Sequence, residues 1–344
     1  MHIIRPIEER DEDSLIQLAN HAKAGLPTLP RDSNRLKVKL VNSLKAFSAT
    51  APFIRHEQYF FVLENLETDT IEGCCAIHTS TKSPIPNYYY SLETIRIPRR
   101  SLDLMSLEHE LLFPQAHEDD SSKICTLYLS AECRKSGLGR LLSLSRFLFI
   151  ACHPERFEKK MTSEMRGVLD PSGKSPFWEA IGRHFCDIDC DILQSLYETE
   201  RHIAGEIIPH FPIYCILLPK DAQEAIGQVH SLTSPAMKML YDEGFQKYNV
   251  IDVFDGGPHL MASTDNIRTI KTSKKVIVKA IVNERETNKI FEHKLLSNTK
   301  LNFRACHQEI CLEDEEKSVI LNKATADALM VEPGDEICYN TLRG

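Results

Sequence analysis

The sequence lacks the features that would direct the protein to a membrane or to nucleic acid. No uninterrupted apolar stretch approaches the roughly 20 residues that a membrane-spanning helix needs, and Met1 to Arg10 alternates apolar and charged residues, unlike a signal peptide. Positive charge is not in excess, because the formal net charge is −8 at pH 7. This balance argues against an electrostatic grip on nucleic acid or anionic lipid. We therefore expect no nucleic-acid partner and no membrane partner.

Paired cysteine motifs are also missing. The eleven cysteines are scattered, and no Cys-x-x-Cys occurs. The nearest approaches are Cys74–Cys75, Cys186/Cys190 and Cys306/Cys311. Structural zinc sites usually need tighter pairs with histidines in register, so we expect no metal site. Free thiols in a reducing compartment are the simpler interpretation, and they predict a cytoplasmic protein.

The chain does contain the patterning of an ordinary globular protein, and its 344 residues are enough for two domains. Helices are predicted over 11–22, 34–47, 141–152, 219–229 and 236–244, and strands over 2–7, 59–64, 71–79, 88–97, 124–129 and 245–254. This order favours an α+β or mixed-sheet α/β fold over a doubly wound parallel sheet. From about 274 onward, alternating strand patterns (276–282, 301–305, 337–339) predict a small β-rich C-terminal region, 271–344, after a main domain, 1–270.

The segment between the strand 124–129 and the helix 141–152 carries the chemistry of an anion site. Arg134, Lys135 and Arg140 surround Gly137 and Gly139 at the mouth of the helix. Glycines let the backbone approach a pyrophosphate closely, and the N–H groups and dipole of the first helical turn attract it. The third glycine of a dinucleotide fingerprint and the Gly-Lys-Ser/Thr ending of a triphosphate loop are both absent. A glycine-containing turn that caps a core helix remains the alternative.

The Arg-x-x-Gly-x-Gly arrangement after a strand resembles the acyl-CoA loop of GCN5-related N-acetyltransferases. Other segments resemble one family, the arginine N-succinyltransferases. They are Gly25 to Pro30, Cys125 to Leu127, Leu142 to Phe147, Glu164 to Gly167, Ser175 to Trp178, Ile226 to His230 and Ile251 to Pro258. The resemblance implies a mixed, mostly antiparallel sheet flanked by helices, in which the strand before the loop splays from its neighbour and pairs with the pantetheine arm.

The resemblance also implies roles for individual residues. His230 matches the family's proton donor, and imidazole can exchange a proton near neutral pH. Leu127 matches a residue that contacts succinyl-CoA, while Arg134, Lys135, Gly137, Gly139 and Arg140 become candidates for the pyrophosphate. Without the resemblance, His230 would be an ordinary surface or packing histidine, and Leu127 a core leucine.

The acceptor half of the site rests on charged residues in the matching segments. Glu164, Asp252 and Asp255 are candidates for the substrate guanidinium, although each carboxylate could instead cap a turn. Arg166 could meet the succinyl carboxylate, or form a structural ion pair. The region of Tyr88–Tyr90 and 96–118 fits the family loosely, which leaves open the choice between arginine, ornithine and another amine.

The function that follows is transfer of a succinyl group from succinyl-CoA, a co-substrate, to the α-amine of L-arginine, with no permanently bound cofactor. The alternatives are an acyltransferase that uses acetyl-CoA or acts on another amine, and a non-catalytic acyl-CoA-binding homologue. The family is also associated with homo- or hetero-oligomers of related chains.

Overall fold

The computed structural model describes residues 1–22, 26, 28–48, 56–80, 86–97, 107–117, 120–134, 136–197, 200, 202–283 and 290–342. Gly25, Pro27 and Lys135, which belong to two of the motifs above, lie outside these ranges. Within the described ranges no helix is both long enough and apolar enough to cross a bilayer.

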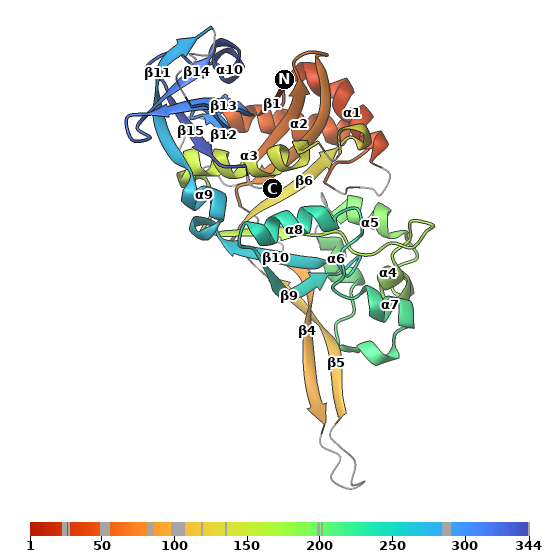
Figure 1. Cartoon of the computed structure of the whole chain (residues 1–344). Coiled ribbons are helices and arrows are strands. Elements are labelled where there is room, and N and C mark those ends of the chain that lie inside the picture. Colours follow the sequence, from red (N-terminus) through yellow and green to blue (C-terminus); the bar gives the residue numbers. More distant parts are fainter. Residues whose placement is uncertain are drawn as a thin grey trace.

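One sheet runs through the whole molecule (Figure 1). Its strands are β1 (His2–Pro6), β2 (Gln58–Asn65), β3 (Thr70–His78), β4 (Asn87–Ile97), β5 (Leu107–His117), β6 (Ser122–Leu129), β7 (Lys160–Glu164), β8 (Ile213–Tyr214), β9 (Gln246–Asp252), β10 (Pro258–Ser263), β11 (Lys274–Val282), β12 (Glu292–Asn298), β13 (Ala305–Glu313), β14 (Ser318–Asn322) and β15 (Glu336–Asn340). Their order is β12-β15-β11-β14-β13-β1-β2-β3-β6-β7-β10-β9-β4-β5-β8. Among these strands only β6–β7 and β11–β14 pair in parallel, so the mixed, mostly antiparallel sheet of the described residues confirms the predicted fold class.

The helices flank this sheet. They are α1 (Glu12–His21), α2 (Ser33–Ser48), α3 (Leu138–Cys152), α4 (Pro176–Ala180), α5 (Cys190–Tyr197), α6 (His202–Ile207), α7 (Lys220–Ala225), α8 (Ser234–Asp242), α9 (Arg268–Thr272) and α10 (Lys323–Leu329). Helices α1 and α2 cover one face of β2 and β3, and α3 covers the other. Alternate residues of β2 divide between the two faces: Phe60 packs with α1 and α2, whereas Phe61 packs with α3.

The C-terminal strands complete the packing around α3. Strands β11 to β15 close on themselves, because β12 pairs with both β15 and β13. Leu295, Phe303 and Cys338 from this group belong to the same buried core as Phe149 of α3. The rings of Phe149 and Phe303 lie 5.2 Å apart, edge to face, an arrangement that stabilises aromatic pairs. The C-terminal region therefore forms one wall of the core that holds α3.

The other end of the sheet carries the small helices. Helices α4 to α7 pack on β4 and β9 around a separate buried cluster that includes Phe177, Trp178 and Phe254. Strands β4 and β5 form a long hairpin that extends away from the body of the molecule (Figure 1). Strand β9 pairs with the base of that hairpin through Tyr89 to Ser91, which fixes the position of these residues next to the small helices.

Two predicted elements are wrong in extent. The predicted strand 301–305 is a turn followed by the first residue of β13, because the Asn298 side chain holds the turn: its Nδ2 donates to the Asn302 carbonyl and its Oδ1 accepts from the Arg304 N–H. The predicted helix 219–229 ends at Ala225, since Ile226 already adopts an extended ψ of 117°.

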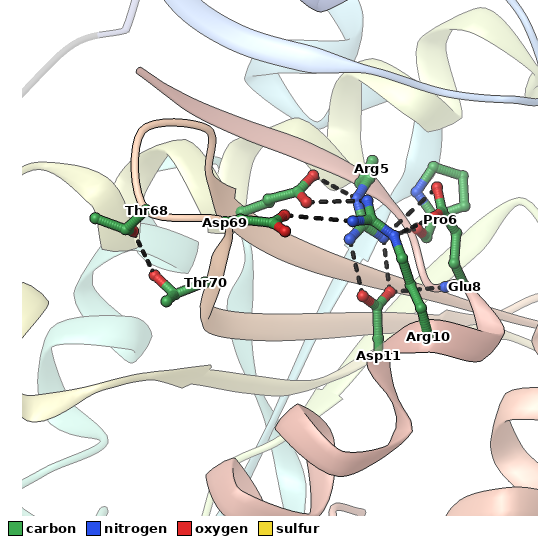
Figure 2. A network of polar contacts seen from close by, with 9 residues as sticks. Arg5, Pro6, Glu8, Arg10, Asp11, Thr68, Asp69 and Thr70 are labelled. Carbon is green, nitrogen blue, oxygen red and sulfur yellow. Dashed lines mark hydrogen bonds and ion pairs between the residues drawn. The ribbon is translucent and has the colours of Figure 1, made fainter.

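Arg5 anchors the first strand to the first helix through a buried charge network (Figure 2). Its guanidinium donates to both oxygens of Asp11 (2.6 and 2.8 Å) and to Glu64 on β2 (2.6 Å). Arg10 donates to the second oxygen of Glu64 at 3.0 Å. Burying charges is costly unless each one is paired and hydrogen-bonded, as here.

Replacing Asp11 with asparagine should therefore destabilise the protein strongly. Asp11→Asn removes the carboxylate that accepts two hydrogen bonds from buried Arg5, and we expect a loss of about 3 kcal/mol or more in the free energy of unfolding. Urea denaturation measures it. Asp327→Asn is the matched control: Asp327 forms an exposed pair with Lys323 at 2.7 Å, so its loss should change stability by about 0.5 kcal/mol or less. Equal effects of the two substitutions would contradict this account.

Candidate functional site

A pocket opens where β6 and β7 part. Strand β6 pairs with β3 along its length, from Lys123 to Leu129, but among the described residues it pairs with β7 only at Ser122 and Lys123. Beyond that point the two strands separate, as the resemblance to acyl-CoA transferases implies. The pocket between them is lined by residues 123–127 of β6, by 163–166 of β7 and the chain that follows, and by side chains of α3, α8 and β9.

Strand β6 is distorted where it borders the pocket. Its register against β3 shifts between Cys74 and Ala76, so that an additional residue of β6 is accommodated there. Thr126 has φ of +55°, which is a strained backbone conformation for a β-branched residue. A bulge of this kind re-aims neighbouring groups and is typical of strands beside functional sites. The predicted residue Leu127 lies next to it, lines the pocket and packs on the α3 core; its contact with an acyl-CoA stays a prediction.

The glycine-containing loop leads from the end of β6 into α3. Gly137 caps the helix with φ of +84°, a left-handed conformation that favours glycine, and its carbonyl accepts the N–H of Arg140 and Leu141. The first turn of a helix leaves its other N–H groups without intrahelical acceptors, which makes it an anion site. Arg134, one of the candidates for the pyrophosphate, is held at the end of β6, because its Nε donates to the Leu129 carbonyl (3.2 Å). Gly139 and Arg140 lie in the first turn of α3.

His230 is fixed through its backbone to Arg166. The His230 N–H donates to the Arg166 carbonyl (2.8 Å), next to a bridge between Gly167 and Val229. Nδ1 of His230 accepts the Leu232 N–H (3.2 Å), which assigns the proton of the neutral ring to Nε2. Partial burial lowers the pKa of His230, the charge of Arg166 lowers it further, and Asp255 opposes both. Within the described part of the chain, Thr233 is the residue of this segment that lines the pocket, and His230 itself is not in the lining.

Asp252 and Asp255 both line the pocket and also shape a turn. Oδ1 of Asp252 accepts the N–H of Phe254 (2.8 Å) and Asp255 (3.0 Å), and Oδ1 of Asp255 accepts that of Gly257 (2.9 Å). The two interpretations of these carboxylates are thus compatible. Burial raises the pKa of Asp252, and the negative charge of Asp255 adds to this shift. A cation that entered the pocket would favour the ionised form of the pair.

Two glycines hold this turn against the chain that follows β7. A Cβ on Gly257 would lie 2.0 Å from the Met165 carbonyl oxygen, and one on Gly167 would lie 2.1 Å from the Asp255 carbonyl oxygen. Both separations are impossible for any other residue without backbone movement. The motifs Glu164 to Gly167 and Ile251 to Pro258 are therefore two sides of one close contact, which places Arg166 beside the acidic pair.

Glu164, the third predicted acid, has a partner that the sequence did not reveal. It lines the pocket, forms an ion pair with Lys123 of β6, and accepts a long hydrogen bond from the Tyr89 hydroxyl (3.5 Å). Lys123 and Glu164 lie on the two strands that part here, so their pair spans the start of the separation. Tyr88 and Tyr89 of the loosely matching region also line the pocket.

Arg146 was given no role in the site on sequence grounds, although it lies in the matching segment Leu142 to Phe147. This residue of α3 lines the pocket, although it is only 2% exposed. A signal was present: it is the one charged residue of Leu141 to Cys152, an otherwise uncharged helical stretch. Within the described ranges no group of three or more His, Cys, Asp and Glu side chains is arranged to hold a metal ion.

Comparison with known proteins gives one consistent family. The family model described as "Arginine N-succinyltransferase beta subunit" matches residues 2–269, and that of the subunit's C-terminal domain matches 275–341. An arginine N-succinyltransferase of Escherichia coli O127:H6 is 36% identical over 98% of this chain and 96% of its own length. Another, of E. coli O1:K1, is 39% identical over 81% of this chain and 80% of its own length. The structure of arginine/ornithine succinyltransferase subunit AI from Pseudomonas aeruginosa matches with a TM-score of 0.88 and 33% identity, over 100% of this chain and 99% of that one.

Removing the positive charge of Arg166 should raise the pKa of His230. Because a nearby cation disfavours the imidazolium, Arg166→Met favours protonation, and the titration midpoint of the His230 ring should move to higher pH. NMR titration of the ring signals measures it. Asp255→Asn should move the midpoint the other way, and Lys323→Met in the C-terminal region should leave it unchanged. A fall in the midpoint on substitution of Arg166 would contradict the electrostatic account.

Proposed function

The chain belongs to the arginine N-succinyltransferase family, and we propose that it transfers the succinyl group of succinyl-CoA to the α-amine of L-arginine, giving N2-succinylarginine and CoA. The observation that supports this most is the parting of β6 from β7 above a pocket that holds a buried acidic pair on one wall. The separated edge of β6 offers backbone groups to a pantetheine arm, and the acidic pair offers carboxylates to a guanidinium.

On the donor side, the pantetheine arm would pair with β6 beside Leu127, where the strand has left β7. Its pyrophosphate would then reach the start of α3, where Gly137 and Gly139 open the backbone. Arg134, Lys135 and Arg140 are the cations available there. The distance along β6 from the bulge to the loop thus separates the thioester from the phosphates.

On the acceptor side, Asp252 and Asp255 would bind the guanidinium, because both line the pocket and a cation there would relieve the repulsion between them. Glu164 borders the same space, but its pair with Lys123 already satisfies part of its charge. Arg166 lines the same pocket and would be available to a substrate carboxylate. The α-amine would be held between these groups and the thioester.

His230 would move the proton. Attack of the neutral amine on the thioester carbonyl forms the amide C–N bond and breaks the C–S bond. The neutral ring takes up the proton that the acylated nitrogen releases, and the imidazolium so formed donates a proton to the departing thiolate, so the histidine is unchanged after each cycle. The lowered pKa of His230 favours the neutral form of the ring, which is the form that can accept this proton.

We also propose that the chain assembles with copies of itself or with a related chain. The Pseudomonas relative is named as a subunit, and Phe211, Ile216 and Leu217 are between 63% and 80% exposed beside β8, an apolar surface of the kind that interfaces cover. Light scattering of the purified protein tests this.

A donor-by-acceptor activity matrix tests the reaction. Thiol release with succinyl-CoA should depend on arginine and exceed that with acetyl-CoA, ornithine or lysine. His230→Ala should lower kcat by about 10²- to 10⁴-fold, whereas His210→Ala, an exposed histidine outside the motifs, should not. Higher rates with ornithine or acetyl-CoA would reassign the acceptor or the donor. Stabilisation by succinyl-CoA with no turnover would instead support a binding protein.

Substitution of Gly137 tests the loop separately from the chemistry. Gly137→Ala strains a left-handed residue by about 1 to 2 kcal/mol, which should turn the loop N–H groups away and raise KM for succinyl-CoA roughly tenfold. Gly173→Ala is the matched control: Gly173 has φ of +89° and lies in the turn from Asp170 to Lys174, and a Cβ added to either glycine would meet no atom within 4 Å. Gly173→Ala should lower the free energy of unfolding by a similar amount and leave KM for succinyl-CoA unchanged. Equal KM values for the two variants would remove the loop from the donor site.

A further inference from the structure

Arg146 is a buried cation without a buried anion among the described residues. Its Nε donates to the Ser143 carbonyl (3.1 Å), Nη2 to the Ser143 hydroxyl (2.9 Å), and Nη1 to the Cys125 carbonyl (3.4 Å). All three acceptors are uncharged, and the last contact is long. Within the described ranges the guanidinium therefore makes only neutral hydrogen bonds, while it lines the pocket on the α3 side.

The other described arginines that are buried to this degree have acidic partners. Arg5, 1% exposed, binds Asp11 and Glu64, and Arg156, 4% exposed, lies 3.6 Å from Glu57. A buried guanidinium without such a partner is costly, and burial lowers the pKa of Arg146. A fold that pairs two buried arginines and leaves the third facing a pocket provides a place for an anion that arrives with a ligand.

The position of Arg146 indicates which part of the ligand this is. Arg146 lies about 12 Å along the helix axis from Leu138, well away from the pyrophosphate end of α3. It contacts Cys125 instead, beside the bulge of β6 that borders the thioester. Arg166, the other arginine in the described lining of the pocket, follows β7 instead, and its charge and that of Asp255 act on His230. The anion near Arg146 is therefore carried by the acyl group of the donor.

We propose that Arg146 binds the free carboxylate of the succinyl group and thereby selects a dicarboxylic acyl donor. This inference rests on the proposed function of the same pocket. The planar guanidinium suits a carboxylate, and the Ser143 hydroxyl orients it. An acetyl group brings no charge and leaves Arg146 uncompensated. Arg166 is then available for the α-carboxylate of the amino-acid acceptor.

A cycle of protein and ligand changes isolates this contact. Affinities of succinyl-CoA and of its methyl ester, which lacks the charge, are measured by calorimetry for the wild type and for Arg146→Met, without acceptor. The wild type should bind succinyl-CoA about 10- to 100-fold more tightly than the ester, and Arg146→Met should bind the two equally. The same preference in both proteins overturns the proposal.

Two further variants cover the alternatives. Arg166→Met should keep the preference for succinyl-CoA over the ester. If Arg166→Met loses this preference and Arg146→Met keeps it, the succinyl carboxylate is assigned to Arg166. If Arg146→Met does not fold, Ser143→Ala retains the guanidinium but loosens its orientation, and should reduce the preference severalfold; an unchanged preference counts against Arg146. Because these affinities need no turnover, they decide the role of Arg146 even if arginine-dependent CoA release, measured in parallel, fails and removes the proposed reaction.

Discussion

The site depends on one constraint, which is that β6 pairs with β3 on both sides of its bulge but, among the described residues, pairs with β7 only at Ser122 and Lys123. A strand in the middle of a sheet normally has both edges satisfied, and unpaired backbone groups are costly when buried. Within the described ranges, the stretch of β6 without a β7 partner includes residues 124–127, which border the pocket. The bulge at Thr126 and the ion pair of Lys123 with Glu164 mark the two ends of the transition. The strands thus separate where a ligand with its own peptide-like groups can replace the missing neighbour.

The opposite wall is built by close backbone contact rather than by side-chain packing. Gly167 and Gly257 let the chain after β7 touch the turn after β9, and this contact brings Arg166, Asp252, Asp255 and the backbone of His230 together. Each acidic side chain spends one oxygen on the turn, which orients it. The carboxylates that line the pocket are therefore the same groups that form the turn, so a substitution of either residue changes both the pocket and the turn.

Much of this could be predicted from the sequence, and the reasons for the rest are physical. The strand, loop and helix around Gly137 have strong local signals, as do the helices α1 and α2, so their existence and type followed from pattern alone. The partner of Glu164 could not be predicted, because Lys123 is 41 positions away and the parallel pairing of β6 with β7 has no local signal. Arg146 was hidden for the opposite reason: its helix looked like pure core, and only tertiary structure shows that one face of it borders a pocket. Strand β5 was missed because its pairing with β4 is what makes it a strand. The boundary near residue 270 stays a prediction.

The C-terminal strands have a consequence for the order in which the enzyme matures. Leu295, Phe303 and Cys338 supply one wall of the core around Phe149, so α3 has its full set of buried contacts only when the last strand, β15, has joined. Domains assemble as the chain leaves the ribosome, N-terminal parts first. A nascent chain that has completed β1 to β10 already carries every residue that lines the pocket, yet α3 still exposes an apolar side. Until the last strands are in place, α3 therefore lacks one of the walls that bury it in the finished fold.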